Sequence, residues 1–88
     1  MKKWNVTLLR KADKQLQKLP KAIQDIAFEA LEDLAAEGAM PKHWNVKKTN
    51  INEYRLRINY RYRMRYKVEQ EQLIIEIFYI GHRKDAYK

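Results

Sequence analysis

The sequence predicts an α+β fold in which an N-terminal strand and a helical hairpin pack on one face of an antiparallel β-sheet of about four strands. Two patterns carry this prediction. Residues 54–68 alternate between apolar and polar side chains, which is typical of β-structure with one buried face. Between residues 12 and 34, apolar side chains recur every three or four positions, which is typical of amphipathic helices.

The first half of the chain predicts one strand and two helices. Residues 4–9 are short and apolar and predict the strand. Apolar side chains at helical spacing predict one helix over residues 12–19 and a longer one over residues 23–34. Pro20 separates these helices, and Gly38 provides a stop for the second.

The alternating segment must fold back on itself. Its 15 residues, at about 3.3 Å each, would extend roughly 50 Å as a single strand, whereas a chain of this size has a radius of gyration of about 12 Å. A loop of three residues, Asn59–Arg61, pairs Ile58 with Tyr62 and keeps all apolar side chains on one face. We therefore expect two antiparallel strands that share a polar face.

The remaining segments predict a connector, a turn and a last strand. Residues 39–48 are polar and basic and predict the connector. The polar residues 69–72 predict a turn that places Val68 opposite Leu73. Residues 73–80 are almost continuously apolar, so we expect a strand with neighbours on both sides.

Composition limits the possible functions. The 88 residues suffice for a single domain, residues 1–88, with one modest core. Nineteen Lys and Arg against 11 Asp and Glu give a net charge of +8, which favours a nucleic acid, an anionic membrane or an acidic protein as partner. No cysteine is present, which excludes disulfides and thiol chemistry. Neither a signal peptide nor a membrane span is apparent, so we expect a cytoplasmic protein.

The polar face of the predicted hairpin is almost entirely cationic. The planar guanidinium group of arginine matches phosphate, and like charges on neighbouring strands destabilise a sheet unless an anion or acid offsets them. Charged side chains can also merely protect a sheet from aggregation. Because the arginines are clustered, we favour an anion-binding surface made by Arg55, Arg57, Arg61, Arg63 and Arg65.

The C-terminal segment, residues 81–88, contains the imidazole of His82, the guanidinium of Arg83 and the phenol of Tyr87. Such groups suit RNA cleavage by attack of a 2′-hydroxyl on its adjacent phosphate, because the reaction needs a base, a charge stabiliser and an acid. A metal site is not expected, since His43 and His82 are far apart and neither has a carboxylate or cysteine at ligand spacing. No cofactor is expected either.

Four segments resemble, in order, those of the RelE/ParE superfamily of bacterial toxins from toxin-antitoxin systems, and the RelE-like branch in particular: 18–20, 53–58, 62–66 and 81–87. The resemblance implies an antiparallel sheet with two helices on one face. RelE-like members are ribosome-dependent endoribonucleases that cut mRNA and inhibit translation. The implied partners are therefore the ribosome, mRNA and a cognate acidic antitoxin.

The resemblance also implies roles for single residues. RelE itself has lysines where this chain has Arg55 and Arg57, and arginine keeps its proton near neutral pH. These two can therefore only stabilise charge, and the general base is Tyr87 or His82. Together, the resemblance and the basic face give catalytic roles to Arg63, His82, Arg83 and Tyr87, and RNA-phosphate binding to Arg55, Arg57, Arg61 and Arg65.

Two other functions stay open. A ParE-like protein would inhibit DNA gyrase by binding, although ParE-type members generally lack the segment that begins at Arg83 and ends at Tyr87. The replaced lysines also allow a catalytically degenerate relative that only binds RNA or antitoxin. Such a protein would bind RNA in a salt-sensitive manner without cleaving it.

Overall fold

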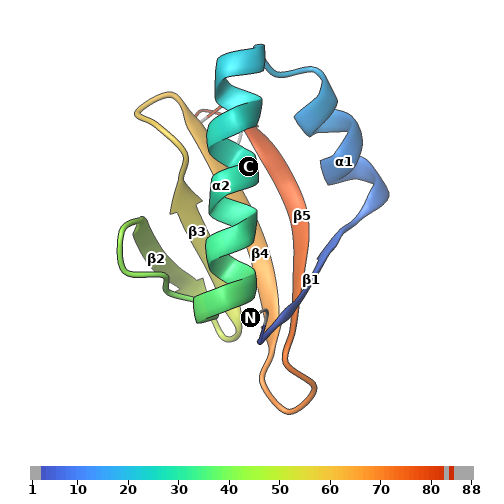
Figure 1. Ribbon diagram of the computed structural model, residues 1–88, viewed down its shortest axis with the longest axis vertical. Coiled ribbons are helices and arrows are strands. Elements are labelled where there is room, and N and C mark those ends of the chain that lie inside the picture. Colours follow the sequence, from blue (N-terminus) through green and yellow to red (C-terminus); the bar gives the residue numbers. More distant parts are fainter. Residues whose placement is uncertain (1–2, 83, 85–88) are drawn as a thin grey trace.

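The computed structural model describes residues 3–82 and 84. Their strands form one five-stranded sheet in the order β1-β5-β4-β3-β2, and both helices lie on one of its faces (Figure 1). β1 is parallel to β5, and all other neighbours are antiparallel. The elements are β1 (Asn5–Leu8), α1 (Arg10–Gln17), α2 (Lys21–Glu37), β2 (Asn45–Asn50), β3 (Glu53–Arg57), β4 (Tyr62–Glu69) and β5 (Ile74–His82). The α+β prediction is confirmed, with five strands instead of about four.

The two predicted helices are confirmed, with observed bounds of Arg10–Gln17 and Lys21–Glu37 in place of residues 12–19 and 23–34. Pro20 immediately precedes α2, where its fixed φ angle suits a helix start. Gly38 ends α2 with φ 97° and ψ −158°, a conformation that is essentially restricted to glycine. The indole of Trp4 covers this glycine so closely that a Cβ atom there would lie 2.9 Å from Trp4 Nε1.

The core lies between the helices and the apolar face of the sheet. Tyr66 is its largest fully buried side chain. The Tyr66 hydroxyl donates a hydrogen bond to the carbonyl of Ala39, and its ring stacks on Tyr54 across the strand pair with centroids 5.8 Å apart. Burial, and to a smaller extent the nearby Tyr54, raises the pKa of the Tyr66 phenol above its ordinary value. Tyr66 is therefore a neutral structural group.

The β3–β4 hairpin has the predicted parity. The Ile58 N–H donates to the Tyr62 carbonyl at 3.0 Å, and Leu56 lies opposite Met64. Asn59 closes the loop, because its side-chain oxygen accepts from the backbone N–H groups of Arg61 at 2.8 Å and Tyr62 at 2.9 Å. The molecule measures 32 Å in its longest dimension, so the alternating segment does fold back.

The extra strand is β2, whose first four residues lie within the segment 39–48 that was predicted as a connector. Its six residues are exposed except for the half-buried Val46, so no alternation marks them as a strand. Trp44, just before β2, ties this edge to the helix layer, because its indole N–H donates to Asp33 Oδ2 at 2.7 Å. The edge strand is thus held by this hydrogen bond, by packing of Val46 on the core and by its pairing with β3.

The predicted register of the last two strands is wrong. Val68 lies opposite Ile75 and not Leu73. The reason is that Leu73 belongs to the turn: it adopts a positive φ of 54°, and its N–H bonds the carbonyl of Gln70 at 3.3 Å. β5 does have a neighbour on each side, as predicted.

A β-bulge interrupts the pairing of β4 with β5. Tyr66 lies opposite Ile77, whereas Arg65, the preceding residue, lies opposite Tyr79, so Phe78 is an extra residue in β5. The bulge reverses the alternation after Ile77. As a result Ile77 and Ile80 are both buried in the core.

No helix in the part of the chain that the structure describes is long and apolar enough to cross a membrane.

Candidate functional site

The sheet face opposite the helices carries two rows of polar side chains that cross β2, β3 and β4. The first row consists of Asn45, Arg57 and Arg63. The second consists of Lys47, Arg55 and Arg65. Side chains directly opposite each other in such pairs are close, and the two rows are about 7 Å apart along the strands.

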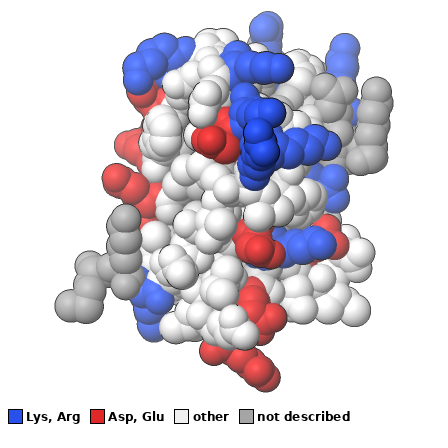
Figure 2. Space-filling view, turned by 90° about the vertical axis from the view of Figure 1, so that its right-hand side faces the viewer, with Lys and Arg blue, Asp and Glu red and all other residues white. Residues whose placement is uncertain are grey.

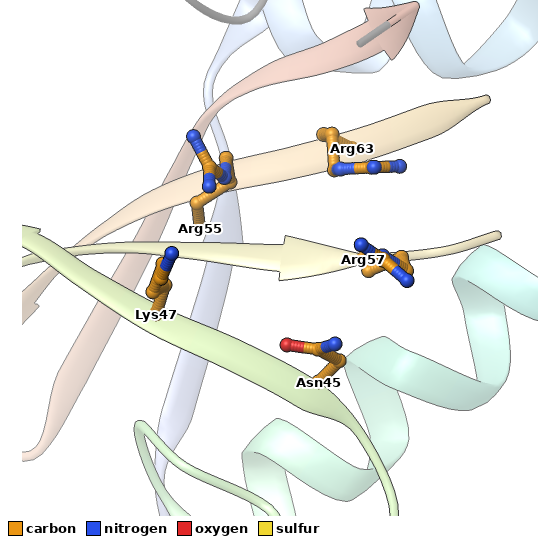
Figure 3. Close-up of a pocket in the computed structure, with 5 residues that line it drawn as sticks. All are labelled: Asn45, Lys47, Arg55, Arg57 and Arg63. Atoms are coloured by element: carbon orange, nitrogen blue, oxygen red, sulfur yellow. The ribbon is translucent and has the colours of Figure 1, made fainter. Parts of the chain in front are cut away.

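A pocket of about 220 Å³ opens at these rows (Figure 3). Among residues 3–82 and 84, no acidic residue lines it. Cations that converge without an acid attract a multiply charged anion strongly. Five side chains from three strands line the pocket: Asn45, Lys47, Arg55, Arg57 and Arg63.

Arg63 is the buried cation of this group, with 6% of its surface exposed. Its Nη1 atom donates to the carbonyls of Asn59 and, at 3.1 Å, Tyr62. These bonds fix the guanidinium against the β3–β4 turn. Arg63 thus has a structural role in the hairpin in addition to lining the pocket.

Arg57 and Lys47 are the exposed cations of the pocket. Within residues 3–82 and 84, neither side chain makes a hydrogen bond or an ion pair. Their charged groups can therefore bind a ligand without first breaking an internal contact. These two side chains are the most direct probes of the pocket.

Arg65 and Arg61 lie beside the pocket and do not line it. Arg65 forms an ion pair of 3.8 Å with Glu53, and its guanidinium lies 5.1 Å from the ring centroid of Phe78. Arg61, in the β3–β4 turn, donates from Nε to the Tyr60 hydroxyl at 2.8 Å and lies over the Tyr60 ring. Of the five predicted arginines, the pocket brings together Arg55, Arg57 and Arg63.

His82 lies at the end of β5 directly opposite Tyr62. The two rings touch edge to face, with centroids 5.8 Å apart. Tyr62 belongs to the apolar set that packs on the core, so the imidazole lies on the helix side of the sheet and not on the basic face. The other two predicted catalytic residues, Arg83 and Tyr87, lie outside the described residues.

The sequence prediction did not include Asn45 and Lys47 in the site. Both belong to β2, whose strand character the sequence hides. Their only signal was the alternation of Asn45 and Lys47 around Val46, which is too short to define a strand. In the part of the chain that the structure describes, no group of three or more His, Cys, Asp or Glu could hold a metal ion.

Negative charge is concentrated on α2, away from the pocket. This helix contains five acidic residues and a single lysine. Figure 2 shows acidic side chains along the left edge of the molecule. This edge corresponds to the front of Figure 1, where α2 lies. The acidic residues are Asp25, Glu29, Glu32, Asp33 and Glu37.

Solved structures of toxin-antitoxin proteins share this fold. A chain of the archaeal RelE–RelB complex from Pyrococcus horikoshii OT3 is 26% identical, with a TM-score of 0.77, and the match covers 91% of this chain and 94% of that one. The YoeB dimer from Staphylococcus aureus is 24% identical, with a TM-score of 0.73 and coverages of 89% and 94%. The isolated RelE toxin of E. coli is 16% identical, with a TM-score of 0.73 and coverages of 96% and 90%.

The fold is one that toxins of toxin-antitoxin systems adopt. The profile of the ParE toxin of the type II system parDE matches residues 6–87, and the chain belongs to this family. No curated protein sequence matches the chain. The prediction of the RelE/ParE superfamily is confirmed, and the matches carry the names of both of its branches.

Proposed function

We propose that this toxin is an endoribonuclease that cleaves mRNA on the ribosome, in the cytoplasm, and that a cognate acidic antitoxin inhibits it. One observation carries the proposal: four cations from three adjacent strands line one pocket, which has no acidic side chain among the residues that the structure describes. Attack on a phosphodiester adds negative charge to the phosphate in the transition state. Preorganised cations stabilise that charge more than they stabilise the substrate.

The reaction requires no cofactor. The 2′-oxygen of the substrate forms a bond to the adjacent phosphorus while the bond from phosphorus to the 5′-oxygen breaks, which gives a cyclic phosphate and a 5′-hydroxyl. A base takes the 2′-hydroxyl proton, and an acid supplies a proton to the 5′-oxygen. Arg55 and Arg57 stabilise the phosphate charge together with Arg63, because arginine does not release its proton.

The proton-transfer groups of the proposal come from the C-terminal segment. Tyr87 or His82 acts as the base, Arg83 stabilises the charge on the departing 5′-oxygen, and solvent water supplies the proton that this oxygen takes. The position of His82 against Tyr62 favours Tyr87 as the base, since the imidazole would have to leave its ring contact to reach the basic face.

The test is cleavage of mRNA on programmed ribosomes by the purified toxin. We expect a cut in the mRNA with wild-type toxin, and a loss of about 100-fold or more in the Tyr87→Phe variant, with a smaller loss in His82→Ala. The reverse order would assign the base to His82. Absence of any cut with wild-type toxin would refute the endoribonuclease.

A second candidate is inhibition of DNA gyrase by binding, which the match to the ParE family favours. It predicts that the purified toxin blocks supercoiling by gyrase at concentrations that leave ribosome-bound mRNA intact. A supercoiling assay beside the ribosome assay separates the two candidates, because each predicts activity in only one of them.

A further inference from the structure

The β-bulge in β5 directs two successive aromatic side chains to the basic face. In a regular strand, neighbouring side chains point to opposite faces. Here Ile77 and Ile80 are both in the core, so the two residues between them, Phe78 and Tyr79, share the other face. Bulges often redirect side chains beside functional sites.

Phe78 packs against the cations of β4. Its ring centroid lies 5.1 Å from the guanidinium carbon of Arg65 and 5.8 Å from Lys67 Nζ. The Arg65 side chain also pairs with Glu53, so its guanidinium is held on both sides. The result is a half-exposed surface made of one aromatic ring and one guanidinium.

Tyr79 lies along the sheet toward the pocket. Its backbone is opposite Arg65, but its phenol extends over Gly81, where a Cβ atom would lie 2.6 Å from the Tyr79 hydroxyl oxygen. Gly81 is in turn opposite Arg63, which lines the pocket. The absence of a side chain at residue 81 therefore leaves room for the phenol over the strand position that pairs with Arg63.

We propose that Phe78, Tyr79 and Arg65 form a nucleobase subsite, which binds a base of single-stranded RNA next to the phosphate held in the pocket. This proposal rests on the proposed function and adds the part of the substrate that the cations do not recognise. Unpaired bases stack on aromatic rings and on guanidinium planes. The subsite lies about 7 to 10 Å from the pocket, because the two are separated by two residues along a strand, about 7 Å, or by two strand spacings across the sheet, about 10 Å. One nucleotide spans such a distance. A purely phosphate-binding face would need cations only.

The experiment compares two RNA strands. One is a single-stranded heptanucleotide with 2′-O-methyl groups, which cannot be cleaved by 2′-hydroxyl attack, and the other is the same strand with its three central bases removed. Affinities are measured by fluorescence anisotropy at fixed salt. Stacking of one base predicts that wild-type toxin binds the complete strand at least about 5-fold, and up to about 150-fold, more tightly than the abasic strand.

Two variants test the subsite. Phe78→Leu combined with Tyr79→Leu should lose most of the preference for bases and keep its affinity for the abasic strand, because the pocket is intact. Gly81→Ala should reduce the preference as well, since its methyl group displaces the Tyr79 phenol. As a matched control, Tyr60→Leu removes an exposed ring of the β3–β4 turn, outside the subsite, and should keep the full preference.

Either of two results would overturn the subsite. The first is a wild-type toxin that binds both strands equally, which is also what a surface for an acidic peptide predicts. The second is an unchanged preference in both Gly81→Ala and the double leucine variant, or in Gly81→Ala alone if the double variant does not fold. A toxin that prefers bases but cuts no mRNA on ribosomes would retain the subsite and refute only the endoribonuclease.

Discussion

Replacing Arg57 by alanine should separate the pocket from the overall charge of the protein. Arg57 lines the pocket, is exposed, and makes no side-chain hydrogen bond or ion pair within residues 3–82 and 84. Its removal should therefore change stability by no more than about 0.5 kcal/mol. Arg61→Ala is the matched control, because it removes the same charge from an exposed position that does not line the pocket.

The size of the effect follows from the contacts that Arg57 would make. A hydrogen bond to a charged group contributes about 1.5–3 kcal/mol, so Arg57→Ala should weaken binding of single-stranded RNA by about 10- to 150-fold. If Arg57 also stabilises the transition state, cleavage on ribosomes should fall by a factor of about 100 to 1,000. One lost phosphate contact should reduce the slope of log affinity against log salt by about 0.7.

The assays are anisotropy with a 2′-O-methyl RNA at several salt concentrations, and single-turnover cleavage of mRNA on programmed ribosomes. Arg61→Ala should differ from wild type by less than about 3-fold, because an exposed charge outside the pocket is largely screened. Equal losses in Arg57→Ala and Arg61→Ala would refute the pocket as the phosphate site. RNA binding would then depend on the net positive charge of the protein and not on the pocket.

Three other predictions concern the edge strand, the end of α2 and the core. Lys47→Ala should reduce RNA affinity nearly as much as the loss of Arg57, whereas Lys48→Ala, on the other parity of β2, should have little effect in the same anisotropy assay. Gly38→Ala should lower the free energy of unfolding by about 1–3 kcal/mol in urea titrations, because it forces a left-handed φ of 97° on alanine and crowds Trp4; an unchanged midpoint would contradict this. Because the raised pKa of Tyr66 keeps its proton in the folded state while the unfolded phenol ionises near pH 10, stability should fall as pH rises above 10, by up to about 1.4 kcal/mol per pH unit. Tyr66→Phe should lose this component of the slope, and an unaltered slope would argue against it.

The hairpin and the helices could be predicted because their signals are long and redundant. Fifteen alternating residues define both faces of β3 and β4, and an odd loop is the only length that keeps Ile58 and Tyr62 on one side. The arginines of the pocket follow directly from that parity. Pro20 and Gly38 then determine where α2 begins and ends.

The errors fall where the sequence is uniform. β5 is apolar on nearly every residue, so neither the turn at Leu73 nor the bulge at Phe78 changes its composition. Strict alternation along the strand therefore could not predict that Phe78 and Tyr79 both lie on the basic face. β2 has the opposite problem, because an exposed edge strand with only Val46 half-buried resembles a polar loop.

The acidic helix α2 lies on one face of the sheet and the cationic pocket on the other, so the molecule has an electric dipole moment across the sheet. In the field of a polyanion such a protein experiences a torque as well as an attraction, so it rotates as it approaches. The sheet then arrives first and the helix layer faces solvent. Productive encounters become more frequent than random orientation allows, and the advantage fades as salt shortens the range of the field.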